Sequence, residues 1–179
     1  MRDVGPNEKT HIDFQALLRF LIEFVKHPIQ KISNLPDWNW PSLLVVHIVL
    51  SIVSGVLAGL LKLNFYRVAF GLLLMPMVST VSVLLMSLFL YYYFQFFENR
   101  IENFRKIFTL VVLSSIPFYL FQIISEYFSA ISLIGFAFAS LLSIVGLCDN
   151  FRMEKKRAYQ LVGLVFGIVV IAWVGNKIN

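Results

Sequence analysis

His47 is the only ionisable side chain inside the long apolar segments of this sequence, so it is the first candidate for chemistry. Ionisable groups at membrane depth usually mark ion or proton pathways. A proton relay needs further polar partners at the same depth, and the apolar segments supply none. We therefore expect His47 to be hydrogen-bonded to a neighbouring helix or to a lipid headgroup. Proton-coupled transport is disfavoured, whereas uncoupled passage of a lipid or an apolar solute is not.

Sequence motifs for catalysis, metal binding and phosphate binding are absent. The 179 residues contain no HExxH, CxxC, GxSxG or glycine-rich phosphate loop. The single cysteine, Cys148, excludes an intramolecular disulfide and a metal site built from cysteines. We expect a protein that is not an enzyme, with no catalytic, cofactor-binding or metal-binding residues.

Two prolines within the apolar segments are the next candidates, and one lies in the stretch SSIPFYLF at 114–121. Pro117 removes a backbone donor and clashes with the carbonyl four residues earlier. In lipid, neighbouring helices or Ser hydroxyls must satisfy the freed group, and Ser114 and Ser115 lie close enough to help. We expect a static bend that faces other protein, with a hinge for movement as the alternative. Pro76 is a second place for a kink.

The composition is typical of a helical membrane protein. Hydrophobic residues make up 59% of the chain and charged residues 14%, against about 25% charged residues in soluble domains. One crossing needs roughly 20 apolar residues, and five charge-free runs are long enough. The sequence predicts an all-α bundle within residues 41–176, with transmembrane spans at about 41–61, 70–94, 107–125, 128–148 and 158–176. The second run reaches residue 97, and we interpret its aromatic end (YYYFQFF) as lying at the membrane interface rather than as part of another span.

Small residues spaced by four predict where the spans approach each other closely. They lie at Ser51, Gly55 and Gly59 in the first span, at Gly135, Ala139 and Ser143 in the fourth, and at Gly163 and Gly167 in the fifth. Such patterns serve packing within one chain as readily as dimerisation, so self-association stays open. The short link around Glu126 predicts an antiparallel hairpin of spans three and four.

The positions of Lys and Arg predict the orientation of the chain. Twelve lie in the N-terminal segment and in the loops after spans two and four, whereas three lie on the opposite side. The positive-inside rule then puts the N-terminus in the cytoplasm and the C-terminus outside. Anionic lipid headgroups are a sufficient partner for the net charge of +5, and no nucleic acid is needed to explain it.

An amphipathic cytoplasmic arm is predicted at residues 13–35, after a tail at 1–12 that we expect to be mobile. Phe14, Leu17, Leu18, Leu21 and Val25 follow helical spacing, Asp13 is a suitable N-cap, and Pro28 ends or bends the helix after His27. Such a helix can lie in the interface with its apolar face towards acyl chains, pack on the ends of the spans, or offer a face to another protein.

Three segments together resemble the Yip family of Ypt/Rab-interacting membrane proteins, over roughly residues 14–175. They are HPIQKI at 27–32, FRKIFTLVVLSSIPFYLF at 104–121 and VGLCDNFRMEKKRAYQLV at 145–162. The resemblance implies a cytoplasmic arm, five spans and no enzyme activity. Eukaryotic relatives contact Rab GTPases through an acidic, aromatic motif that DVGP at 3–6 does not match, and the arm is short. The resemblance therefore favours a bacterial member in the cytoplasmic membrane; a eukaryotic member would lie in endomembranes.

Two functions follow from these observations. The first is a non-catalytic membrane protein that organises the bilayer or recruits a protein partner through its arm and basic loops. The alternative is a small channel, transporter or lipid scramblase, suggested by the prolines in spans two and three and by the serines near them. We expect the five helices to enclose a solid core rather than a polar cavity.

Overall fold

The computed structural model describes residues 13–125, 127, 128 and 130–178, so the tail at 1–12 and Glu126 lie outside it. Regular structure in the described part is helical throughout. Five segments are long and apolar enough to cross a membrane, namely α3, α4, α5 together with α6, α7 and α8, which confirms the predicted all-α fold with five spanning helices. The helices are α1 (Phe14–Lys26), α2 (Pro28–Ile32), α3 (Trp40–Leu61), α4 (Phe65–Phe97), α5 (Phe104–Ser114), α6 (Ile116–Ser125), α7 (Ile131–Phe151) and α8 (Lys155–Ile178).

Helix α4 crosses as one element of 33 residues, although Pro76 lies inside it. Its first turn is capped by Asn64, whose side chain accepts a hydrogen bond from the Arg67 N–H at 3.2 Å. Its last turn ends at Glu98, whose N–H donates to the Phe94 carbonyl. The second apolar run is therefore one span that continues through its aromatic end, and it does not divide into two.

Helices α3 and α4 form a close pair because glycines face each other across their interface. A Cβ added to Gly55 would lie 2.7 Å from the Gly71 Cα, and one added to Gly59 would lie 2.6 Å from the Val68 nitrogen. Real Cβ atoms do not approach other atoms so closely, so only glycine permits this backbone contact. A similar approach joins α6 and α7, where a Cβ on Gly135 would lie 2.6 Å from the Phe121 Cβ.

The centre of the bundle is α5. Eight consecutive residues, from Ile107 to Ser114, are buried, so every face of this short helix is covered. Neighbours on all sides come from α2, α3, α4 and α7. A helix that is apolar all round belongs in the interior of a bundle, and α5 is the element around which the others assemble.

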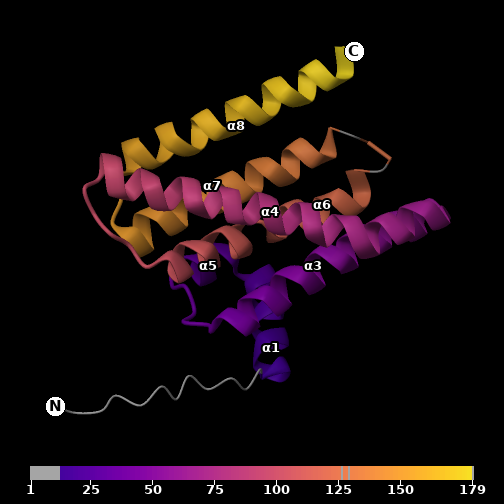
Figure 1. Cartoon of the computed structure of the whole chain (residues 1–179), viewed down its shortest axis with the longest axis horizontal. Coiled ribbons are helices and arrows are strands. Elements are labelled where there is room, and N and C mark those ends of the chain that lie inside the picture. Colours follow the sequence, from indigo (N-terminus) through magenta and orange to yellow (C-terminus); the bar gives the residue numbers. More distant parts are fainter. Residues whose placement is uncertain (1–12, 126, 129, 179) are drawn as a thin grey trace.

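Helix α8 lies at the edge of the bundle. Figure 1 shows it alongside α7, on the side away from α1. The rings of Phe136 and Phe166 stack between the two helices, with centroids 5.8 Å apart. Gly163 and Gly167 do not serve this packing, because a Cβ added to either would meet no atom of the described chain beyond its own helix within 4 Å. The close helix approach expected at these two glycines is therefore wrong for the chain by itself.

Candidate functional site

Helix α1 carries one broad apolar face, of which one part is buried and the other exposed. Leu17 and Phe24 lie in the buried part, which packs towards the rest of the arm. Phe20, beside them, meets the ring of Trp38 edge-on at 4.8 Å. The exposed part is a stripe of four side chains that are each at least half exposed; we call it the α1 stripe, and it consists of Phe14, Leu18, Ile22 and Val25. An exposed apolar stripe on an amphipathic helix is suited to a lipid surface or to a protein partner.

The arm is fixed to the end of α7 by Asn150. Its amide nitrogen donates to the Ile32 carbonyl at 2.8 Å, and its amide oxygen accepts from the Leu35 N–H at 3.1 Å. Ser33 adds a hydrogen bond to the Asp149 carboxylate at 2.6 Å. Ile32 is fully buried beside Gly146, whose missing side chain leaves room for it. The second half of the arm is thus part of the bundle, and α1 extends from it.

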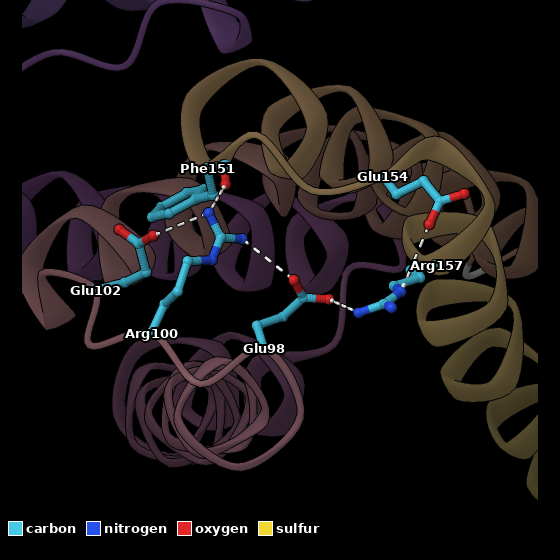
Figure 2. A network of polar contacts seen from close by, with 6 residues as sticks. All are labelled: Glu98, Arg100, Glu102, Phe151, Glu154 and Arg157. Atoms are coloured by element: carbon cyan, nitrogen blue, oxygen red, sulfur yellow. Dashed lines mark hydrogen bonds and ion pairs between the residues drawn. The ribbon is translucent and has the colours of Figure 1, made fainter.

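A charged network joins the loop after α4 to the loop after α7 (Figure 2). The Glu98 carboxylate accepts hydrogen bonds from Arg157 at 2.8 Å and from Arg100 at 3.4 Å. Arg100 also donates to the Phe151 carbonyl at 3.0 Å and lies 3.7 Å from the Glu102 carboxylate. Nearby, Arg105 pairs with the Asp37 carboxylate at 2.8 Å. Three arginines at this end of the bundle, Arg100, Arg105 and Arg157, are therefore held by carboxylates or carbonyls.

A groove of about 540 Å³ lies between α4 and α8, with parts of α5, α6 and α7 as its floor. Helices α4 and α8 do not pack closely against each other in the described part of the chain, which leaves the groove half open. Its lining is mainly apolar and includes Val83 and Leu90 of α4, Ala139 of α7, and Val162 and Val169 of α8. The groove is open at the side of the bundle and mainly apolar, so it is not an enclosed polar cavity, and the solid core stays a prediction.

The serines of SSIP line this groove, but they bond a different carbonyl from the one that Pro117 frees. Helix α5 ends at Ser114 and α6 begins at Ile116, so the helix breaks at Ser115, two residues before the proline. The hydroxyls of Ser114 and Ser115 both donate to the Val111 carbonyl, at 3.1 and 2.7 Å. The Ser115 N–H donates to the Val111 carbonyl at 3.1 Å and also to the Leu113 carbonyl, which is the group that a proline at 117 leaves without its helical donor.

Pro76 and His47 are brought together by a serine. The Pro76 carbonyl accepts hydrogen bonds from Ser79 at 3.1 Å and from Thr80 at 2.6 Å, so hydroxyl groups support α4 around the proline. The Ser79 oxygen lies 3.4 Å from Nε2 of His47. His47 is fully buried between α3, α4 and α6, with the ring of Tyr119 6.0 Å away. This small polar cluster is a contact between helices.

Two residues that matter for these sites were missed at the sequence level. In the sequence, Asn150 lies in the polar segment between spans four and five, and Gln122 lies within the apolar run of span three. Neither position shows by itself that the side chain has a special contact. Gln122 lies at one end of the groove, with its amide nitrogen 3.7 Å from the Met75 sulfur. Its amide oxygen is buried and has no hydrogen-bond partner in the described chain. A buried amide within an apolar span is the signal that could have identified it.

The described residues contain no group of three or more His, Cys, Asp or Glu that could hold a metal ion. The site candidates are therefore surfaces: the α1 stripe and the groove.

Comparison with known proteins gives one match. A family model described as the Yip1 domain matches residues 22–175. Neither the curated proteins nor the solved structures contain a match to this chain.

Proposed function

Because the chain belongs to the Yip1 domain family, with five apolar helices and an attached arm, we propose that it is a non-catalytic protein that organises the membrane through that arm. The α1 stripe inserts among the acyl chains of the leaflet at the arm end of the bundle. That end faces the cytoplasm, in a bacterial cytoplasmic membrane. In this proposal residues 13–35 act as the membrane-modifying part and residues 41–176 as the anchor.

The observation that carries the proposal is the arrangement of α1 in cross-section. The α1 stripe is exposed, and the polar side chains next to it include Arg19 and Lys26. Basic residues bordering an apolar face are typical of helices that lie in the plane of an anionic interface, where the cations contact phosphates and the apolar side chains enter the hydrocarbon. The buried Phe24 and Leu17, on the side of the helix next to the stripe, hold α1 to the rest of the arm.

Attachment to the spans makes this insertion effective. The arm is held by Asn150, and the segment that follows it is held by the ion pair of Arg105 with Asp37, so α1 enters the leaflet at a fixed distance from the bundle. A wedge of side chains in one leaflet then displaces lipid beside each copy of the protein. The expected outcome is local curvature or sorting of lipids around it.

The experiment places an environment-sensitive fluorophore on α1 in a chain whose native Cys148 is replaced by serine. Leu18→Cys puts the fluorophore on the α1 stripe, and Gln15→Cys puts it on the polar side of the same helix. In vesicles with anionic lipid, we expect blue-shifted emission at position 18 and emission typical of water at position 15. Equal, water-like emission at both positions would overturn the proposal.

A change in vesicle shape tests the organising role itself. The variant with Leu18, Ile22 and Val25 all replaced by serine keeps the buried face of α1 and loses most of the α1 stripe. Vesicles reconstituted with the intact chain are expected to be smaller or more elongated than vesicles with this variant at equal protein density. The same size distribution for both proteins would contradict the role.

Recruitment of a protein partner is a second candidate, favoured by the rigid presentation of the same apolar stripe. The test compares the proteins that co-purify with the full chain and those that co-purify with a chain that lacks residues 1–35. Loss of a specific partner on deletion supports recruitment, whereas retention of every partner shows that the arm does not recruit.

A further inference from the structure

We propose that the groove between α4 and α8 binds one acyl chain of a membrane lipid, with the polar ester group of that lipid beside Gln122. The groove shares no residue with the α1 stripe, so this lipid site and the proposed role of the arm can fail independently of each other.

The position and size of the groove suit a single chain. Its lining extends along α4 from Met75 to Leu90, which is about 22 Å of helix at 1.5 Å per residue. Half of a hydrocarbon layer is about 15 Å thick, so the groove accommodates one chain within a leaflet together with the ester at its head. A dry cavity of about 150 Å³ holds a benzene ring, and by that measure the 540 Å³ of the groove has room for about twenty carbon atoms.

The lining presents few free polar groups to a ligand. Ser82, Ser115 and Ser143 lie along the groove, but each hydroxyl donates to a carbonyl of its own helix, at 2.9, 2.7 and 2.9 Å. Such bonds leave the methylene groups as the main contact surface. This lining therefore favours a hydrocarbon ligand over water.

Gln122 supplies the polar end. It lies one turn from the end of α6, close to the α3–α4 end of the bundle. Its buried oxygen lacks a partner, and its nitrogen has only the weak acceptor of Met75. An ester carbonyl accepts from the amide nitrogen, and a glycerol hydroxyl or a lipid amide donates to the oxygen. The side chain also borders a second cavity of about 400 Å³, lined by Asn64 and Arg67, in which a headgroup can lie.

A helix of another protein is a poorer fit than an acyl chain. A cylinder about 10 Å across and 22 Å long has a volume of about 1,700 Å³, roughly three times that of the groove. Opening the groove for a helix would require α8 to leave its stacked contact between Phe166 and Phe136. A single chain enters sideways from the bilayer with both helices in place.

The test uses phosphatidylcholine that carries a photoactivatable diazirine at one of two places in an acyl chain, incorporated into vesicles with the full-length protein. We expect a diazirine near the carbonyl to label Met75 and Gln122, and one at mid-chain to label Val83 and Val162. Outward-facing Leu73 and Leu85, which any bulk lipid contacts, provide the background. Labelling of lining residues no stronger than this background, or the reverse order along the groove, overturns the proposal.

A variant that fills the groove provides the second arm. Ser140→Trp puts an indole into the groove, and Leu141→Trp puts it on the exposed side of the same helix turn. Labelling of Val83 is expected to fall roughly tenfold in the first variant, because the ring occupies the volume that the ligand needs, and to stay unchanged in the second. If Ser140→Trp does not fold, the labelling pattern of the unmodified chain still decides. Crosslinks to a second protein copy at the lining residues, in place of lipid, would also refute the proposal.

Discussion

Glu98 and Arg157 join the end of α4 to the start of α8 through a hydrogen bond of 2.8 Å. The two helices form the sides of the groove and otherwise do not pack closely, so this pair joins them at the arm end, beyond Leu90 and Val162, where the groove lining ends. The Glu98 side chain is only 12% exposed and Arg157 is 50% exposed. The carboxylate is thus the sheltered partner, and Arg100 holds it from the other side (Figure 2).

Glu98→Gln is expected to loosen the start of α8. The neutral amide loses the charge-assisted bonds to two arginines, while the interior of the bundle is untouched. Faster tryptic cleavage within residues 152–157, the loop before α8 and its first turn, by several-fold, is the readout. Glu154→Gln is the matched control, because Glu154 pairs with Arg157 at 3.5 Å within the same helix turn and does not reach α4. Equal cleavage rates in both variants would show that the Glu98 pair does not hold α8.

Gly71→Ala is expected to destabilise the α3–α4 pair. The new Cβ would lie 2.3 Å from the Gly55 carbonyl carbon, where only backbone can move aside. Forcing extra volume into a packed contact costs about 1–3 kcal/mol, which should appear as a lower midpoint of thermal unfolding in detergent. Gly163→Ala is the control: its Cβ meets open space, and alanine is the better helix former. We therefore expect an unchanged or slightly higher midpoint there.

Asn150→Ala is expected to release the arm from α7. The substitution removes the hydrogen bonds to Ile32 and Leu35 and leaves their backbone groups without these partners, at a cost of about 1–3 kcal/mol. Hydrogen exchange at residues 28–35 should become faster while exchange in α5 stays slow. Asn34→Ala, at an exposed position of the same segment, should have little effect.

The contact between α1 and α2 is expected to weaken in acid. Glu23 accepts a hydrogen bond from Lys31, and this bond with the Lys31 charge lowers the pKa of Glu23 below its ordinary value of 4.5, with smaller help from Arg19 and His27. A carboxyl whose pKa is lower in the folded state contributes stability above the unfolded pKa and loses it as the pH falls through the folded pKa. The contact should therefore be complete above 4.5 and open progressively as the pH falls through the lower pKa that Glu23 has in the folded chain.

Spin labels at positions 15 and 30, in a chain without Cys148, would measure this opening as a longer and broader distance at low pH. Glu23→Gln should show the same broad distance at both extremes of pH. A pH-dependent distance that persists in this variant would assign the effect to another group.

The orientation can be tested with cysteines in two loops. Leu63, at the α3–α4 turn, is 93% exposed, and Glu154 lies in the loop before α8. With Cys148 replaced by serine, a membrane-impermeant maleimide added to intact cells should label Leu63→Cys and spare Glu154→Cys. The opposite pattern would reverse the orientation and with it the leaflet assigned to α1.

Much of the fold could be predicted because each helix that crosses a bilayer needs a run of roughly 20 apolar residues. Every charge-free run long enough to cross became a spanning helical segment, although the run at 107–125 is divided into α5 and α6, and 68–97 lies within one helix. Hydropathy does not tell apolar helices apart. It therefore did not predict that α5 would lie at the centre and α8 at the edge, where Gly163 and Gly167 meet no other helix of the described chain.

The sites were less predictable because they depend on which single polar atoms meet. Ser114 and Ser115 do support the chain next to Pro117, but through the Val111 carbonyl. The spacing of residues could not reveal that α5 would end before the proline. Gln122 and Asn150 acquire their roles only when α6 meets α4 and when α7 meets the arm.

The length of α4 has a consequence for how this helix lies in the bilayer. At 33 residues the helix is about 50 Å long, whereas a hydrocarbon layer averages about 30 Å. Such a mismatch is relieved by tilting the helix, by letting its tyrosine-rich end rise among the headgroups, or by gathering thicker bilayer around it. The other four spanning segments are 21 or 22 residues long, about 33 Å, so tilt and the interfacial position of the tyrosine-rich end, rather than a thicker bilayer, accommodate the extra length of α4.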